Sequence, residues 1–422
     1  MQNRFISRQA ALALAMVLAS TLIHAQTQTQ GGTLDLSFGT GGKVTANGFL
    51  SGAIVIQQDG KIIAAGGQLV RYNPNGTPDN TFGSGGKVSA VVGASAVALQ
   101  TDGKIVTAGG VENSNYIVSF ALARYNSNGT LDTSFGAGGK VTTDFAGDVF
   151  GPASANATSM ALQGDGKIVV AGYANIDGNE EFAVVRYNSN GALDNTFGTG
   201  GKVITDFGLL EQGFSYVDSA SLAIQGDGKI VVAGRAYIGQ GFDVALVRYN
   251  PDGSLDATFG TGGKLTTDVA GRYDGVFSVA LQPDGKIVAA GQAVGIAFDF
   301  LLLRYNSNGT LDPTFGTGGK VLTDFAGSSE SAFSVALRAD GKIVAAGRIW
   351  NGSNYDWALA RYNSNGTLDA SFGTGGKVTT DFLGDDDEAF SLAIQPDGKA
   401  VVVGAAFSND AWTYLFAMAR YN

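Results

Sequence analysis

The chain has 422 residues, no cysteine and a single histidine, and its formal net charge is −10. The acidic balance argues against binding to nucleic acid or to anionic membrane surfaces, because such binding requires clustered lysine and arginine. The lack of cysteine excludes disulfide bonds and thiol nucleophiles.

Residues 1–25 have the pattern of a secretory signal peptide. Arg4 and Arg8 precede an apolar stretch, Ala10–Ala25, that is too short to span a bilayer. No stop-transfer pattern follows it, so a membrane anchor is the weaker alternative. We therefore expect a secreted protein, periplasmic or extracellular, with no stable membrane insertion.

The chain that remains after residue 25 carries 25 basic and 37 acidic side chains, a net charge of −12. It has no histidine, because His24 lies within the signal peptide. Histidine general bases, Ser-His-Asp triads and zinc sites built from histidine or cysteine are thereby excluded from the mature protein.

A short linker at residues 26–33 leads into residues 34–422, where one unit of about sixty residues occurs seven times. Three sequence markers, Phe-Gly, Asp-Gly-Lys and Arg-Tyr-Asn, recur in the same order in every copy. The Phe-Gly markers begin at Phe38, Phe82, Phe135, Phe197, Phe259, Phe315 and Phe372. The Arg-Tyr-Asn markers begin at Arg71, Arg124, Arg186, Arg248, Arg304, Arg361 and Arg420.

Each unit contains four short segments with the pattern of β-strands, which the copy beginning at Lys264 illustrates. Strand D (Lys264–Asp268) is β-branched, and strand A (Ser278–Gln282) alternates small or polar with larger apolar residues. Strands B (Lys286–Gly291) and C (Phe300–Tyr305) are apolar on both faces. No segment has apolar residues at helical spacing over ten or more positions.

Strands that are apolar on both faces need cover on both sides of their sheet. Neighbouring copies provide this cover when four-stranded sheets pack radially around an axis. The sequence therefore predicts an all-β fold: a single seven-bladed β-propeller with four-stranded antiparallel blades. A right-handed β-solenoid is the alternative, although its coils are usually shorter than this unit.

The two ends of the repeat array predict how the ring closes. The chain reaches Asn422 at the end of a third strand, and its first residues after the linker match the turn that would come next. The segment near Lys43–Ala46 should therefore supply the outer strand of the last blade and remove the open sheet edges. We expect Val44 to pair with the strand that ends at Tyr421.

The repeated text resembles the bacterial delta-60 repeat family. The matching segments are Leu-Asp-x-x-Phe-Gly-x-Gly-Gly-Lys-Val, Val-Ala-Leu-Gln-x-Asp-Gly-Lys-Ile-Val-x-Ala-Gly and Ala-Leu-Ala-Arg-Tyr-Asn. They cover essentially the whole mature chain. The resemblance implies an exported bacterial propeller and specifies no biochemical activity.

Antiparallel strands place the A–B and C–D turns on one face of the disc and the B–C and D–A loops on the other. The A–B turn is Asp-Gly-Lys in every copy and the C–D turn is nearly fixed, so these turns form what we call the constant face. The B–C and D–A loops differ in every copy and form the variable face. Because varied loops suit a binding site, we expect function on the variable face.

The constant face contains an Arg and an Asp in every copy, eight residues apart across the C–D turn. We interpret them as an ion pair that braces the turn, and a ring of seven anion sites is the alternative. The Asn-Ser-Asn-Gly turn has too few carboxylates for a calcium loop and is explained by Asx-turn chemistry. The aspartates concerned are Asp35, Asp79, Asp132, Asp194, Asp256, Asp312 and Asp369.

Four consecutive acidic residues in the D–A loop before the last blade form a candidate metal site: Asp385, Asp386, Asp387 and Glu388. They would bind a divalent cation such as Ca²⁺ if neighbouring oxygens converge. A solvated acidic loop is the alternative. Asp274, Glu330 and the acids of residues 211–218 add negative charge to the same face, on which Arg272 is the main basic residue.

Aromatic residues in the last two copies form the candidate ligand site: Trp350, Tyr355, Phe407, Trp412 and Tyr414. A flat apolar platform of this kind stacks on sugar rings, and mutual packing of the loops is the alternative. Asn351, Asn354 and Asn409 would supply hydrogen bonds to a glycan. Trp357 is assigned to the core instead, because it shares the register of core phenylalanines such as Phe300.

These observations favour a secreted, monomeric binding module that presents its varied loops to a glycan, a surface polymer or a protein partner. One alternative is a polysaccharide hydrolase or lyase that uses carboxylates or tyrosine, with Asp274, Glu330, Asp386 and Glu388 as candidate acids. Another is a structural envelope or matrix protein. The sequence marks no catalytic pair and therefore does not indicate an enzyme.

Overall fold

The computed structural model describes residues 31–47, 51–114, 117–145, 154–176, 178–207, 216–239, 241–271, 273–294, 297–325 and 329–422. The predicted signal peptide, most of the predicted linker, Arg272 and residues 211–215 lie outside these ranges. Within them, no helix is long and apolar enough to cross a membrane.

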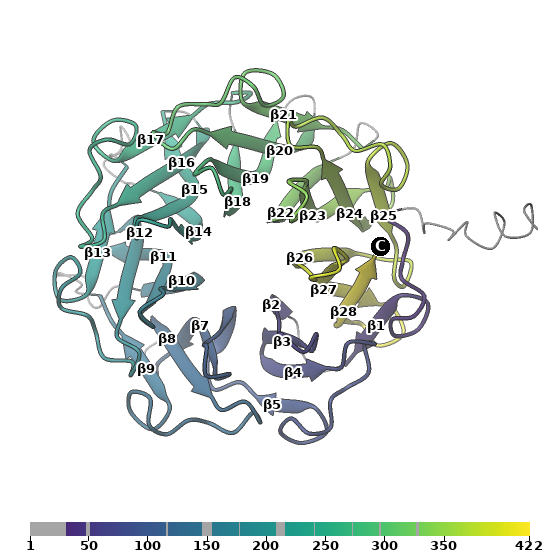
Figure 1. Ribbon diagram of the computed structural model, residues 1–422, viewed down its shortest axis with the longest axis horizontal. Coiled ribbons are helices and arrows are strands. Elements are labelled where there is room, and N and C mark those ends of the chain that lie inside the picture. Colours follow the sequence, from purple (N-terminus) through teal and green to yellow (C-terminus); the bar gives the residue numbers. More distant parts are fainter. Residues whose placement is uncertain are drawn as a thin grey trace, which may run out of the picture.

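The protein is a seven-bladed β-propeller, as the repeat pattern predicts (Figure 1). Each blade is a four-stranded antiparallel sheet, and the first strand of each blade lies nearest the axis while the fourth lies at the rim. Blades 1 to 3 contain β2 (Ser51–Ile56), β3 (Ile62–Gly66), β4 (Gln68–Tyr72), β5 (Lys87–Ser89); β6 (Gly93–Leu99), β7 (Ile105–Glu112), β8 (Val118–Tyr125), β9 (Lys140–Thr143); and β10 (Ser154–Leu162), β11 (Ile168–Ile176), β12 (Asn179–Tyr187), β13 (Lys202–Thr205).

Blades 4 to 7 follow the same order of strands A to D, except that the last strand of blade 7 comes from the start of the chain. They contain β14 (Val217–Ile224), β15 (Ile230–Ile238), β16 (Gly241–Tyr249), β17 (Lys264–Thr267); β18 (Gly275–Leu281), β19 (Ile287–Val294), β20 (Phe298–Tyr305), β21 (Lys320–Thr323); β22 (Glu330–Leu337), β23 (Ile343–Trp350), β24 (Tyr355–Tyr362), β25 (Lys377–Thr380); and β26 (Asp387–Ile394), β27 (Ala400–Ser408), β28 (Thr413–Tyr421), β1 (Lys43–Ala46).

The hydrophobic core lies between the blades. The first five residues of strand B are buried in all seven blades, which is why this strand has no polar alternation. One cluster joins Val231 and Leu246 of blade 4 to Val276, Ile287 and Leu301 of blade 5. Each blade therefore buries both faces of its sheet against its neighbours.

The ring closes through the N-terminal strand. Val44 of β1 pairs with Met418 of β28, the strand that ends at Tyr421, which confirms the predicted closure. The purple N-terminal strand lies beside the yellow C-terminal blade in Figure 1. The Gly32 amide also donates to the Asn422 carbonyl at 2.6 Å.

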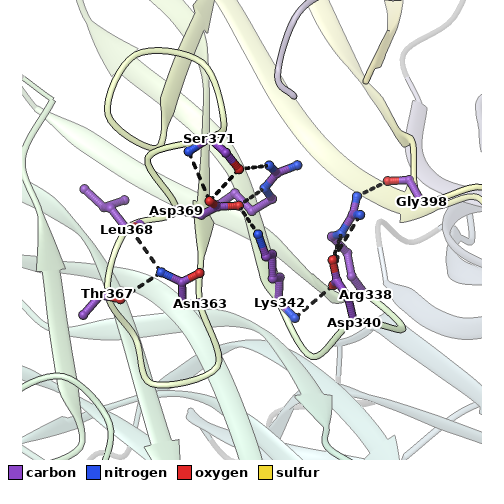
Figure 2. A network of polar contacts seen from close by, with 10 residues as sticks. Arg338, Asp340, Lys342, Asn363, Thr367, Leu368, Asp369, Ser371 and Gly398 are labelled. Carbon is purple, nitrogen blue, oxygen red and sulfur yellow. Dashed lines mark hydrogen bonds and ion pairs between the residues drawn. The ribbon is translucent and has the colours of Figure 1, made fainter. Parts of the chain in front are cut away.

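An Arg–Asp ion pair braces the C–D turn in all seven blades, as predicted. In blade 5, Arg304 Nε donates to Asp312 Oδ2 at 2.7 Å, and both side chains are almost fully buried. Lys286 of the Asp-Gly-Lys turn reaches the same oxygen at 3.0 Å, so one aspartate ties together the A–B and C–D turns. Figure 2 shows the equivalent network in blade 6, where Asp369 accepts from Ser371 and Lys342.

Among the described residues, six of the seven braces also connect neighbouring blades. Arg71 Nη1 donates to the Ser127 carbonyl in the C–D turn of blade 2 at 2.6 Å, and Arg304 makes the corresponding contact with Ser364. The guanidinium of Arg304 also lies over the Phe315 ring, 4.5 Å from its centroid. The residues that are most constant among the repeats are thus explained by structural contacts.

The brace aspartates should make part of the stability dependent on acid pH. Burial alone would raise the pKa of Asp194, but hydrogen bonds from Thr196 and the charge of Arg186 lower it to about 2. Because this folded-state pKa lies below the unfolded value of about 3.9, the stabilising contribution is complete above about pH 5. It is lost as the pH falls toward 2.

We expect the stability advantage of the wild type over Asp194→Asn to be constant above pH 5 and to shrink between about pH 4 and pH 2. Urea unfolding at a series of pH values measures this difference. Asp227→Asn, in the A–B turn of the next blade, is the control and should lose little stability, because Asp227 is exposed. A stability difference between the wild type and Asp194→Asn that does not depend on pH would contradict the lowered pKa of Asp194.

A close approach between strands A and B recurs in the blades. Strand A carries a β-bulge, for example between Ala332 and Ser334 of β22, and strand B has a glycine beside it. A Cβ on Gly347 would lie 1.8 Å from the Ser331 carbonyl oxygen. Only glycine fits this position, at the point where strand A approaches the variable face.

Candidate functional site

The variable face brings the predicted aromatic residues together in two groups. Trp350, the last residue of β23, and Tyr355, the first of β24, form an edge-to-face pair beside the B–C loop of blade 6, with ring centroids 5.2 Å apart. In blade 7, the ring centroid of Phe407 lies 6.4 Å from that of Trp412 and 5.1 Å from that of Tyr414. Trp357, by contrast, is fully buried, which confirms its assignment to the core.

Trp412 is the most unusual residue of this surface. Its side chain is 82% exposed, more than any other large apolar side chain in the described part of the chain. Its φ of 49° is the only positive value found among the described residues other than glycine. A bulky residue in this conformation is strained, and such strain is typical of functional positions.

The predicted acidic loop lies between the two aromatic groups. On the blade 6 side, the Tyr355 amide donates to Asp386 Oδ1 at 2.9 Å. On the blade 7 side, Asn409 Nδ2 donates to Asp385 Oδ2 at 2.6 Å, and the Phe407 amide donates to the Asp386 carbonyl at 2.8 Å. The aromatic groups and the acids therefore form one continuous surface across blades 6 and 7, which we call the aromatic–acidic surface.

The four acids of the predicted metal site have different partners. Asp385 and Asp386 hold the flanking loops, and Glu388 forms an ion pair with Arg348. Only Asp387 lies in a carboxylate cluster, and its partners there come from other segments of the chain. The structure does not bring the four carboxylates together around one point.

The predicted glycan-binding asparagines also contact the protein itself. Asn351 Nδ2 donates to Asp356 Oδ2 at 2.9 Å, and Asn354 Nδ2 donates to the Gly384 carbonyl at 2.9 Å. Asn409 holds Asp385. These side chains shape the loops that carry the aromatic rings.

A second aromatic cluster, which sequence reasoning missed, lies on the variable face at blade 4. Phe242 packs edge to face against Tyr216 and Tyr237, at 5.4 Å and 5.1 Å, and Arg235 lies over its ring. Tyr216 and the neighbouring Tyr273 are 40% and 47% exposed. The signal in the sequence is the presence of these aromatics in the B–C and D–A loops of one copy.

Three carboxylate triads occur at consecutive blade junctions. Each takes one residue from strand C, one from the end of strand D in the same blade, and one from the start of strand A in the next blade. Within each triad, one carboxylate oxygen per residue lies within 4.8 Å of the others. The triads are Asp243, Asp268 and Asp274 (blades 4 and 5); Asp299, Asp324 and Glu330 (blades 5 and 6); and Asp356, Asp381 and Asp387 (blades 6 and 7).

The triads have unusual electrostatics. Burial and the charges of Asp268 and Asp274 raise the pKa of Asp243 to about 6. Burial is also the largest cause that raises the pKa of Glu330 and of Asp387 to about 7. The carboxylates thus repel one another where water is partly excluded. Shifted pKa values with these two causes are common at functional sites.

The candidate acids for catalysis fall in separate places. Asp274 and Glu330 belong to different triads and are fully buried. Asp386 and Glu388 lie in the aromatic–acidic surface, where Asp386 accepts from the Tyr355 amide and Glu388 pairs with Arg348. No two of these four share a triad.

Comparison with known proteins identifies a β-propeller family. The profile of a family described as a domain of unknown function (DUF5122) beta-propeller matches the chain in seven segments, and no curated protein matches it. The segments are residues 57–82, 100–135, 163–197, 225–259, 282–315, 338–372 and 395–422.

Solved structures similar to this chain have diverse names. A protein of unknown function from Dyadobacter fermentans shares 12% identity at a TM-score of 0.49, with 90% of this chain and 97% of that chain covered. A PL25 ulvan lyase shares 12% identity at a TM-score of 0.48, with 86% of this chain and 93% of that chain covered. A puromycin hydrolase shares 14% identity at a TM-score of 0.49, with 87% of this chain and 53% of that chain covered.

Proposed function

The chain belongs to the DUF5122 β-propeller family, and we propose that it is a binding module whose aromatic–acidic surface, across blades 6 and 7, binds carbohydrate. The observation that carries this proposal is Trp412, an exposed indole held in a strained backbone conformation and flanked by other rings. Exposure of an indole to water is unfavourable because the ring is largely apolar. Stacking on the apolar face of a sugar ring would remove this surface from water.

The charge of the surface selects among carbohydrates. Asp385, Asp386 and Glu388 lie between the aromatic groups, and Arg348 is paired with Glu388. Uronate or sulfated polymers would be repelled by these acids. The ligand class that fits best is therefore a neutral or amine-bearing polysaccharide whose pyranose rings reach both aromatic groups.

Trp412→Ala should weaken binding to such a polysaccharide at least about tenfold, because truncating a central aromatic residue costs more than about 1.4 kcal/mol. Affinity electrophoresis in gels containing neutral, amine-bearing or sulfated polysaccharides measures this effect. The wild type should be retarded by the first two kinds and not by the third.

Leu36→Ala is the matched control, since Leu36 is an exposed apolar residue (77%) outside the variable face. It should bind like the wild type. Tyr216→Ala tests whether the second aromatic cluster at blade 4 is the site instead. Absence of retardation by every polysaccharide, or equal binding by the wild type and Trp412→Ala, would refute the proposal.

The proposal includes export, a monomeric state and identity with the delta-60 repeat. A secreted protein meets polysaccharides outside the cytoplasm, and the pattern of residues 1–25 supports this location. Sequencing the N-terminus of the protein recovered from the periplasm or medium tests cleavage after Ala25. Light scattering of the purified protein tests the monomeric state.

A further inference from the structure

We propose that the three carboxylate triads are Ca²⁺ sites that join blades 4 to 7 across their junctions. Each triad takes two ligands from one blade and the third from the next, so a bound ion would connect neighbouring sheets near the variable face. This inference is independent of the carbohydrate proposal, because it concerns other residues.

The buried acid of each triad has one carboxylate oxygen without a hydrogen-bond partner. Asp274 Oδ2 accepts from the Val269 and Ala270 amides, at 2.6 Å and 2.9 Å, while its other oxygen, Oδ1, is buried without a partner. Asp387 Oδ2 accepts from the Phe382 amide at 2.7 Å, and its Oδ1 is likewise unpartnered.

Glu330 repeats the arrangement, with Oε1 bonded to the Phe325 amide at 3.1 Å and Oε2 unpartnered. All three acids are 0% exposed. A buried carboxylate oxygen without a donor is costly, and it recurs at three equivalent positions. In each case the carboxylate lies within a group of oxygens that a cation would satisfy together.

The net charge of each triad fits a divalent cation. A lysine from strand D of the next blade lies at each junction and donates to a backbone carbonyl there. Lys320 Nζ is 2.8 Å from the Asp268 carbonyl oxygen, and Lys377 Nζ is 2.8 Å from that of Asp324. Lys43 contacts the Asp381 carbonyl at 2.5 Å. When all three carboxyl groups are ionised, as they would be around a bound cation, three carboxylates and one ammonium leave two negative charges at each site.

The other blade junctions show that the fold does not need the buried acid. At the position equivalent to Asp274, Glu330 and Asp387, strand A of blades 2, 3 and 4 has the buried apolar residues Val92, Ala155 and Val217. Strand C of blade 2 correspondingly has Ser119 in place of the triad aspartate. At the junction of blades 3 and 4, strand C and the end of strand D still carry Glu181 and Asp206, so the buried acid is what distinguishes the three triads from this junction.

The donor set favours Ca²⁺ over other metals. Every ligand is a carboxylate oxygen, with no nitrogen or sulfur, which suits hard cations. Oxygens bound to Ca²⁺ at about 2.4 Å can lie up to about 4.8 Å apart, which matches the spacing within the triads. Mg²⁺ demands a tighter octahedral geometry, and outside the cell Ca²⁺ modules bind at about 0.1–1 mM.

Equilibrium dialysis of the purified, chelator-treated protein against radioactive Ca²⁺ tests the proposal. We expect about three equivalents to bind at millimolar Ca²⁺, with weaker competition by Mg²⁺. Ca²⁺ should also raise the midpoint of thermal unfolding, because it binds the folded state alone. Less than one equivalent bound at 5 mM Ca²⁺ would overturn the proposal, and this result requires no variant.

Variants assign the ions to the triads. Asp387→Val should bind two equivalents, and the combination with Asp274→Val and Glu330→Val should bind none; valine already occupies this position at Val217. Asp385→Asn, in the same loop as Asp387 but outside the triads, should keep all three. If the triple variant does not fold, the three changes are made to glutamine or asparagine. Undiminished binding by the folded triple variant would refute the assignment.

Discussion

Asp312→Ala should lower the free energy of unfolding by about 3–5 kcal/mol, because it leaves two cations without their shared partner. Asp312 is 2% exposed, and its Oδ2 accepts from Arg304 at 2.7 Å and contacts Lys286 at 3.0 Å. The guanidinium of Arg304 is itself buried, so water cannot replace the lost carboxylate. Urea unfolding followed by circular dichroism measures the loss.

Asp284→Ala is the matched control, because Asp284 contacts the same lysine from an exposed position, at 3.8 Å. An exposed ion pair contributes little, so the expected loss is less than about 1 kcal/mol. Equal losses in the two variants would show that the brace acts as a surface ion pair rather than as a buried anchor.

Gly347→Ala should cost about 3 kcal/mol or more, because the new methyl group has no space. Its Cβ would lie 1.8 Å from the Ser331 carbonyl oxygen, a backbone atom of strand β22 that cannot rotate away. The strands would have to separate at the bulge beside Ala332. Thermal and urea unfolding measure the effect.

Gly226→Ala is the control, since a Cβ at Gly226 meets nothing within 4 Å. Its stability should change by less than about 1 kcal/mol. If Gly347→Ala were as stable as this control, the glycine of strand B would owe its recurrence to something other than the bulge. The same test applies to Gly291, whose Cβ would lie 1.9 Å from the Gly275 carbonyl oxygen.

The fold could be predicted from the sequence because the signal repeats seven times. A single copy of strand B, such as Lys286–Gly291, could equally be part of a buried helix, but four strand-like segments in every copy leave one architecture. The closing strand was predictable for the same reason, since Val44 continues the repeat that Tyr421 leaves incomplete. The brace followed from the spacing of Arg304 and Asp312 across a turn.

The candidate sites were only partly predictable, because burial of a loop residue cannot be read from a single segment. Asp274 and Glu330 look like exposed loop acids in the sequence, yet both are fully buried. Their triad partners lie in strand C and after strand D of the preceding blade, far along the chain. Aligning the copies would have shown a column with acids in three of them and valine or alanine in others, such as Val217.

For the aromatic–acidic surface, the sequence predicts the residues but not their arrangement. Trp350 and Trp412 stand out in the sequence because the other copies have no tryptophan in these loops. Their division into two groups, with Asp385 and Asp386 holding the loops between them, depends on hydrogen bonds that only the structure reveals. The strain at Trp412 likewise has no sequence signature.

The closure of the ring by β1 also constrains how the protein can fold. Arg420 and its partner Asp35 lie 385 positions apart in the chain, so this brace forms only after the blades between them have been synthesised. Closing a free loop of that length costs about 5 kcal/mol in chain entropy. Blades assembled earlier hold the two ends near each other and remove much of this cost. Closure is therefore expected to be a late, slow step, and until it occurs the strand pairing surface of β28 stays open to other chains.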